Sequence, residues 1–194
     1  MALDEFLSAG VHIGMKQRTK DMERFIYKIR PDGLAVLDVQ TIQKRIEIAG
    51  KFLAKHKNIM AVSRKPIGQR AVKRFAEATG SKDAIGRFLP GTLTNPSFRN
   101  FFEPDVIIIT DPAIDSQAIK EAVKTRIPIV AFCDTIDETS NIDFVIPSNN
   151  KGKKAIALLY YLLAKEILKN RGTPETEIKF KAVDFESRER AMEQ

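Results

Sequence analysis

The clearest change between apolar and polar segments lies in residues 105–134. Two short apolar runs, 105–110 and 129–132, flank a stretch with apolar residues at helical spacing. A strand, a helix and a strand within roughly thirty residues are typical of a βαβ unit. Neither run alternates polar with apolar residues, so we expect both faces of each strand to be covered. This pattern predicts a parallel sheet with helices on both sides.

The same pattern predicts further elements around this unit. Expected helices span 3–9, 41–56, 66–79 and 151–170, expected strands span 58–62, 84–87 and 143–146, and residues 25–39 form a hairpin around Pro31-Asp32-Gly33. Residues 155–164 are all apolar, so we expect the last helix to be the most buried. Ser148-Asn149-Asn150 offers capping chemistry before that helix begins.

Two connections stand out in this scheme. Residues 88–104 have no sustained period and contain three prolines and four phenylalanines. Long structured loops of this kind in compact domains are usually functional. Residues 135–141 form a polar turn that is too short for a helix, although parallel neighbours normally need one.

The charge of the chain adds information about its partner. The 194 residues include 32 Lys and Arg against 25 Asp and Glu, a net charge of +7. Residues 173–194 carry a net charge of −2, so the preceding 172 residues carry +9. A basic globular body favours a polyanionic partner such as nucleic acid, and the alternative is an ordinary basic enzyme.

Several classes of protein are disfavoured by the sequence. No apolar run is long enough to cross a bilayer, and the first residues carry acids without a basic region typical of a signal peptide. The single cysteine, Cys133, excludes a disulfide framework or zinc ribbon within the chain, and we expect it to be a small buried hydrophobe. The chain contains no nucleotide-binding glycine motif and no histidine pair at metal spacing. We therefore expect a cytoplasmic protein with no cofactor, no metal, no membrane partner and no small-molecule substrate.

Two aspartates at predicted strand ends leave an enzyme as the rival hypothesis. Asp111 and Asp134 each follow a strand of the βαβ unit, where doubly wound proteins bind nucleotides or sugar phosphates. Asp-Pro and Asp-Thr pairs also form turns and caps routinely. We favour turn formation and capping for both residues, and hence no catalytic residue.

Basic and hydroxyl residues gather in four segments that could bind RNA. The candidate contacts are Lys16, Arg18, Lys20 and Arg24; Arg64, Lys65 and Arg70; Lys151, Lys153 and Lys154; and Thr92, Thr94 and Asn95 in the long loop. Lysines at the start of a helix oppose its dipole, so an anionic partner would relieve that conflict. The hydroxyl and amide groups could donate to phosphates or 2′-hydroxyls. Each cluster alone is most often a solvated face, but together they favour binding to folded RNA.

Motifs along the chain resemble a known family. They are AGVHIG, FIYKIRPDGLAVLDVQT, GRFLPGTLTN, FFEPDVIIITDPAIDSQAIKEA, IPIVAFCDT and IPSNNKGKKAIALLYYLLAKEIL, which span residues 3–172 in order. In this combination they resemble the small-subunit ribosomal protein two family, in its archaeal and eukaryotic form. The resemblance implies a three-layer, flavodoxin-like α/β/α sandwich with a five-stranded parallel sheet and an N-terminal hairpin extension.

The resemblance also implies a function. It implies a structural constituent of the small ribosomal subunit, whose partners are small-subunit rRNA and neighbouring ribosomal proteins, and which catalyses no reaction. His12 and Arg87 match motif positions of the family, and with Arg99 they complete the candidate RNA contacts. We expect one domain over 1–172 and a charged tail over 173–194 that becomes ordered on the ribosome or binds another protein.

Overall fold

A five-stranded parallel sheet forms the centre of the computed structural model, which describes residues 3–173 and 180–187. Its strands are β3 (Ile59–Ser63), β4 (Lys82–Ile85), β5 (Val106–Ile109), β6 (Ile129–Cys133) and β7 (Phe144–Pro147). The spatial order is β4-β3-β5-β6-β7, and every neighbouring pair is parallel. The predicted fold class is therefore confirmed.

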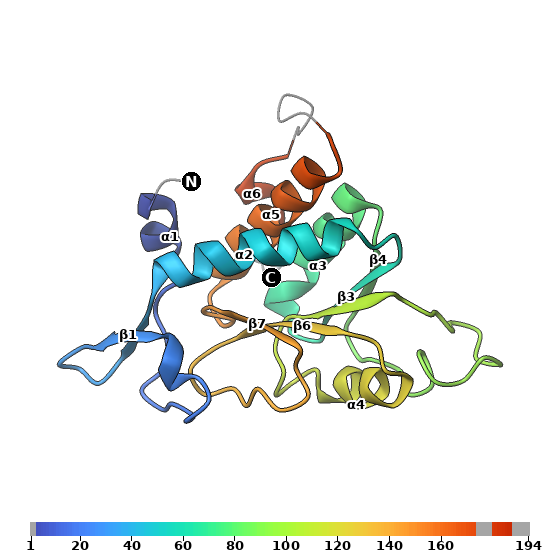
Figure 1. Ribbon diagram of the computed structural model, residues 1–194, viewed down its shortest axis with the longest axis horizontal. Coiled ribbons are helices and arrows are strands. Elements are labelled where there is room, and N and C mark those ends of the chain that lie inside the picture. Colours follow the sequence, from blue (N-terminus) through green and yellow to red (C-terminus); the bar gives the residue numbers. More distant parts are fainter. Residues whose placement is uncertain (1–2, 174–179, 188–194) are drawn as a thin grey trace, which may run out of the picture.

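Helices cover both faces of the sheet, as Figure 1 shows. Helices α2 (Val39–Ala54), α3 (Pro66–Thr79) and α5 (Lys153–Asn170) form one layer, and α4 (Ser116–Thr125) lies on the opposite face. Strands β3, β5 and β6 are buried along their whole length, which explains their unbroken apolar sequences. None of the helices in the described part of the chain is both long and apolar enough to cross a lipid bilayer.

Helix α5 packs between α2 and α3 and is the most buried helix, as its sequence predicts. Tyr160 on α5 is fully buried, and its hydroxyl lies 2.8 Å from the hydroxyl of Thr110 at the end of β5. Gly50 lets α2 approach closely, because a Cβ atom there would lie 2.5 Å from the Cβ atom of Glu166. After α5, Arg171 donates hydrogen bonds to the carbonyls of His56 and Thr79, beyond α2 and at the end of α3.

The N-terminal segment forms a small sheet of its own beside the main one. Helix α1 (Leu3–Ala9) and the short 3-10 helix η1 (Glu23–Phe25) lead into β1 (Ile26–Ile29) and β2 (Ala35–Leu37), which pair antiparallel. This confirms the predicted hairpin extension. The described part of the tail contains α6 (Ala182–Phe185), where Phe185 is buried and packs edge-to-face against Tyr161 of α5. The rest of the tail, whose ordering was predicted to need the ribosome, lies outside the described residues.

The boundaries of several elements differ from the predicted ones. Strand β4 begins at Lys82 rather than Ala84, because an edge strand tolerates polar residues. Helix α5 begins at Lys153 rather than Lys151, and its N-cap is Gly152 without a side-chain cap. By contrast, the connection between β6 and β7 is the predicted turn without a helix, and the two strands are parallel as the predicted sheet requires.

Candidate nucleic-acid interface

The carboxyl ends of the strands, where proteins of this architecture usually bind ligands, are filled by the protein's own polar side chains. Asp111, after β5, forms an ion pair with Lys65, which follows β3. The two side chains are only 3% and 11% exposed. The Lys65 ammonium also donates to the backbone carbonyl of Asn150 at 3.0 Å, so it ties the ends of three strands together.

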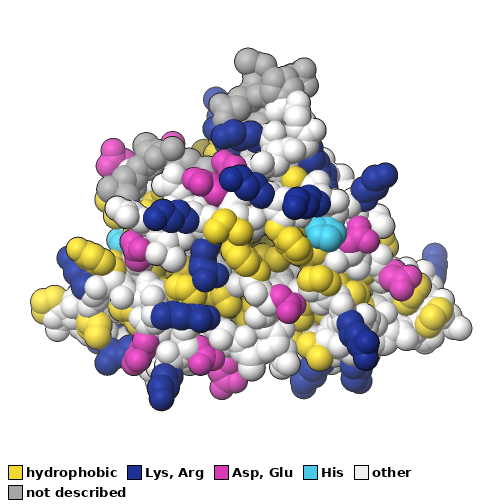
Figure 2. All heavy atoms as spheres, in the orientation of Figure 1, with side chains coloured by type: hydrophobic (Ala, Val, Ile, Leu, Met, Phe, Trp, Pro, Cys, Tyr) yellow, Lys and Arg dark blue, Asp and Glu magenta, His cyan; other side chains and the backbone are white. Residues whose placement is uncertain are grey.

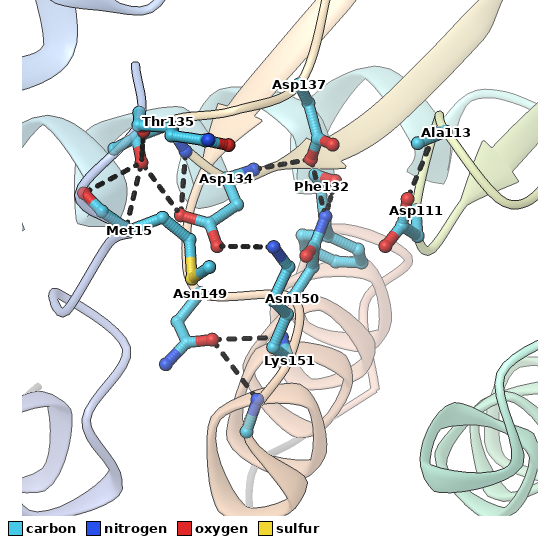
Figure 3. Close-up of polar contacts among 12 residues, drawn as sticks. Met15, Asp111, Ala113, Phe132, Asp134, Thr135, Asp137, Asn149, Asn150 and Lys151 are labelled. Atoms are coloured by element: carbon cyan, nitrogen blue, oxygen red, sulfur yellow. Dashed lines mark hydrogen bonds and ion pairs between the residues drawn. The ribbon is translucent and has the colours of Figure 1, made fainter.

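A second group of contacts continues this network at the ends of β6 and β7 (Figure 3). One carboxylate oxygen of Asp137 accepts hydrogen bonds from the backbone N–H of Asp134 and from the side-chain amide of Asn150, both at 2.7 Å. The same amide of Asn150 donates to the Phe132 carbonyl at 3.2 Å. Lys151 lies at the rim of the network, with its ammonium 3.8 Å from Asp134.

Asp115, at the start of α4, joins two of the strand-end loops. Its carboxylate accepts hydrogen bonds from the backbone N–H of Arg64 at 2.8 Å and from that of Asp111 at 3.2 Å. Burial raises the pKa of Asp115 and the pKa of Asp137 to about 6. Burial also raises the pKa of Asp134 above its ordinary value. These carboxyl groups are therefore structural elements with weakened acidity.

Asp111 and Asp134, the two aspartates on which the enzyme hypothesis was based, form hydrogen bonds within the local backbone. Asp111 accepts hydrogen bonds from the backbone N–H groups of Ala113 and Ile114 and so forms the turn before α4. Asp134 accepts a hydrogen bond from the backbone N–H of Thr135 at 2.7 Å. The predicted turn-forming role is confirmed, whereas neither residue caps a helix: the N-cap of α4 is Asp115, and in the described part of the chain no helix directly follows Asp134. Cys133 is fully buried, as predicted, and burial raises the pKa of its thiol well above the ordinary value.

The loop after β6 anchors the N-terminal basic segment to the ends of the strands. The hydroxyl of Thr135 accepts a hydrogen bond from the backbone N–H of Met15 at 2.9 Å and donates to the Gln17 carbonyl at 3.0 Å. The backbone N–H of Thr19 donates to the Thr135 carbonyl at 2.8 Å. Gly14 permits this approach, because a Cβ atom there would lie 2.5 Å from Thr135. Segment 14–19 is thus fixed in place by contacts with Thr135, a residue that is more than 100 positions away in the sequence.

These contacts, together with the bond from Lys65 to the Asn150 carbonyl, bring members of the three predicted basic clusters to the carboxyl ends of the strands. Met15 contacts Thr135, Thr135 contacts Asp134, and Asp134 lies beside Lys151. Six basic residues of these three segments have exposed side chains, and we call them the strand-tip basic surface: Lys16, Arg18, Lys20, Arg64, Lys151 and Lys154. On the face drawn in Figure 2, basic side chains are interspersed with acidic ones, so the positive charge there does not form one uniform patch.

The fourth cluster lies in the long loop and is held by a residue of α4. Glu121 is 3% exposed, and its carboxylate accepts hydrogen bonds from the backbone N–H groups of Gly91 at 2.9 Å and Leu93 at 3.1 Å. The hydroxyl of Thr94 donates to the same carboxylate at 3.4 Å. Asn95 accepts a hydrogen bond from the backbone N–H of Ser97. Much of the polar chemistry of this motif therefore stabilises the loop itself.

The remaining predicted contacts lie in different environments. Arg24, Arg87 and Arg99 are exposed, whereas Lys153 is half-buried. Arg70 donates to the carbonyl of Asp184 in α6, and the buried Thr92 donates to the Leu89 carbonyl. His12 is half-buried, and its Nδ1 atom has no hydrogen-bond partner among the described residues. Lys65, Arg70 and Thr92 thus already have internal contacts.

Sequence reasoning missed two residues that position the basic segments. Glu121 lies about one turn after the buried Ala118 on the inner face of α4. This helical spacing is the signal that could have identified it as a buried charge. Thr135 is part of the CDT motif, but its partners Met15 and Gln17 are 120 and 118 residues away, which no local pattern reveals.

A doubly wound domain whose ligand position is filled by its own side chains, with basic segments around that position, is a scaffold for binding a polyanion. The family model described as "Ribosomal protein S2" matches residues 6–102 and 98–170. Two relatives, both described as "Small ribosomal subunit protein uS2", come from Methanococcus maripaludis strains C6 and C5. Each is 49% identical over 185 residues, which cover 94% of this chain and 84% of the relative. The chain therefore belongs to the ribosomal protein S2 family.

Proposed function

We propose that the chain binds small-subunit rRNA through the strand-tip basic surface. Membership of the ribosomal protein S2 family makes the protein a structural constituent of the small ribosomal subunit rather than an enzyme. Its partners are accordingly rRNA and neighbouring ribosomal proteins. The proposal concerns which residues make the RNA contact.

One observation supports this choice of surface above all. Thr135 and Asp134 connect segment 14–19 with Lys151, so basic residues from distant parts of the sequence share a rigid frame. A frame fixed before binding reduces the conformational entropy that is lost when long side chains contact phosphates. Phosphate contacts by Lys and Arg supply much of the affinity of such complexes and position the protein on its RNA.

The internal contacts divide the predicted residues into two groups. In this proposal Lys65, Arg70 and Thr92 act inside the protein, because their polar groups already bind Asp111, Asp184 and Leu89. His12, Arg24, Arg87, Thr94, Asn95, Arg99 and Lys153 stay predictions as RNA contacts.

Removal of two charges from the surface tests the proposal. We expect the double variant Lys16→Ala, Lys20→Ala to bind purified small-subunit rRNA more weakly than the unmodified chain. The slope of log K against log salt should fall by about 0.9 for each lost phosphate contact. The matched control is Lys51→Ala, Lys55→Ala, which removes one exposed lysine from the last turn of α2 and another from its C-cap. Binding is measured between about 50 and 200 mM salt, a range over which several phosphate contacts change affinity strongly.

Comparison of the two double variants distinguishes rRNA binding by the strand-tip basic surface from a general effect of lowering the net charge. Equal losses in both double variants would contradict the strand-tip surface and leave only non-specific attraction. A melting temperature equal to that of the unmodified chain for both variants, measured in parallel, would show that neither acts through the fold.

A further inference from the structure

One edge of the main sheet is open. Strand β4 pairs only with β3 among the described residues, and it is the first strand in the spatial order. Backbone groups of alternate residues in a strand point to opposite sides. The N–H of Gly86 donates to the Ser63 carbonyl at 2.9 Å, so Lys82, Ala84 and Gly86 direct their groups toward β3. The N–H and carbonyl groups of Asp83 and Ile85 therefore face away from the sheet.

The opposite edge, at β7, is closed by the protein itself. Arg45 of α2 donates to the Val145 carbonyl at 2.8 Å, and Pro147 has no N–H group to offer. Helix α2 packs against this strand, and beyond it the N–H of Asn149 donates to the Val11 carbonyl. Proteins manage sheet edges in these ways because an open edge attracts another strand. Strand β4 is short and carries the charged residues Lys82 and Asp83, but among the described residues no strand pairs with its outer side.

A groove runs along the open edge. It has a volume of about 450 Å³ and lies between β4 and the loop 88–102. Its apolar lining includes Ile85 and Leu89, whose side chains are 43% and 44% exposed. Its charged lining comprises Lys82, Arg87 and Arg99 against the single carboxylate of Asp83, so the groove is net positive.

We propose that an extended segment of a neighbouring small-subunit protein, carrying acidic side chains, adds to β4 as a sixth strand. This inference rests on the proposed function, since assembly into the subunit supplies the neighbour. Strand addition pairs the free donors and acceptors of an edge, and adjacent pockets select the side chains. The acidic side chains would pair with Arg87 and Arg99, which in this inference bind protein instead of the rRNA that the sequence predicts for them. Apolar side chains would cover Ile85 and Leu89.

The chemistry of the edge favours a polypeptide over the other polymers present. Asp83 and Ile85 offer donors and acceptors in alternation at strand spacing, which a second strand matches group for group. Phosphate oxygens of RNA only accept hydrogen bonds, and they gain nothing from the exposed Ile85 and Leu89. A second copy of this chain would bring another Lys82, Arg87 and Arg99 to a groove that is already positive.

Amide hydrogen exchange tests the pairing directly. The amides of Asp83 and Ile85 should exchange rapidly in the free protein and at least about tenfold more slowly in purified small subunits. The amides of Ala84 and Gly86, bonded to β3, are the internal control and should be protected in both states. Unchanged exchange at residues 83 and 85 in subunits that contain the protein would overturn the inference.

A pair of variants separates the main chain from the side chain. Ile85→Ala keeps the outward N–H, whereas Ile85→Pro removes it and leaves the bonds to β3 in place. We expect about fivefold lower retention of Ile85→Pro than of Ile85→Ala on small subunits in salt washes, the effect of one lost hydrogen bond. Equal retention of two folded variants would count against strand addition. If Ile85→Pro does not fold, a photo-reactive benzoylphenylalanine in place of Ile85 decides the matter.

The cross-linked product identifies the partner. An acidic peptide of another subunit protein supports the inference, whereas a cross-link to rRNA, to a second copy of this chain, or to nothing overturns it. A chain that fails to enter small subunits at all would instead contradict the proposed function, so the two failures are distinguishable.

Discussion

The protein holds two groups of predicted RNA-binding segments in place with buried carboxylates, but it does so in different ways. At the strand ends, Asp111 is paired with the cation of Lys65, and neighbouring aspartates bind backbone and amide groups. In the long loop, Glu121 receives hydrogen bonds from the neutral donors of Gly91, Leu93 and Gln117. At the strand ends the negative charge of Asp111 is neutralised by the positive charge of Lys65. At the loop the negative charge of Glu121 is stabilised by hydrogen bonds from uncharged N–H groups.

This difference determines how each site should respond to change. Removing one member of a buried ion pair leaves an uncompensated charge and costs several kcal/mol. Removing one acceptor from a cluster of neutral donors costs the hydrogen bonds that it made. The strand-end network also connects several loops, whereas Glu121 holds one. Damage at the strand ends should therefore spread further.

The largest effect is expected from Lys65→Met. The variant keeps the side-chain length but leaves Asp111 buried without its cation, so we expect a loss of about 3–5 kcal/mol in the free energy of unfolding. Denaturant unfolding measures it. The double variant Lys65→Met, Asp111→Asn should recover much of the loss because no unpaired charge remains. A loss below about 1 kcal/mol, the range of an exposed pair, would show that the pair is effectively solvated.

A smaller and more local effect is expected from Glu121→Gln. The amide group of glutamine would face at least one N–H donor, so we expect a loss of about 1–3 kcal/mol. The amides of Gly91 and Leu93 should exchange faster, while those of Thr135 and Asp137 should not change. Glu77→Gln, an exposed glutamate on α3, is the matched control. Faster exchange at the strand ends as well would show that the two sites are coupled.

The smallest expected effect is a dependence on pH. The folded-state pKa of Asp115 and that of Asp137 are raised to about 6, above the ordinary value of 3.8. The folded protein therefore takes up protons before the unfolded chain does, and stability rises as pH falls from 6 toward 4. Between pH 7 and pH 5 each group contributes about 1 kcal/mol, which denaturation midpoints at both values measure. Asp137→Asn should remove its share of that rise, and an unchanged pH dependence in the variant would contradict the assignment to Asp137.

Much of the fold follows from the sequence because buried strands and amphipathic helices have periodic patterns. The unbroken apolar runs before Asp111 and Asp134 predict covered parallel strands, and both are central. Strand β4 was misplaced by two residues because its exposed edge lets Lys82 and Asp83 enter the strand. Helix α2 begins at Val39, two residues before the predicted start. The reason is that the side chain of Asp38 caps the helix by accepting hydrogen bonds from the N–H groups of Gln40 and Thr41.

The candidate site was less predictable for a physical reason. The sequence shows which segments are basic, but the frame that joins them consists of single contacts between distant residues. Lys65 meets the carbonyl of Asn150 across 85 positions, and Met15 meets Thr135 across 120. The same sequence properties also do not separate an exposed lysine such as Lys16 from an internally paired one such as Lys65.

The position of α5 after α2 and α3 in the sequence has a consequence for biosynthesis. This helix occupies the space between α2 and α3, and its last buried residue is Ile167. During translation the apolar stripes of α2 and α3, with Ile46 and Phe75 among them, emerge long before the helix that covers them. Such a nascent chain exposes hydrophobic surface and is prone to aggregation until the missing helix arrives. The core of α2, α3 and the sheet is therefore completed only after α5 has been synthesised.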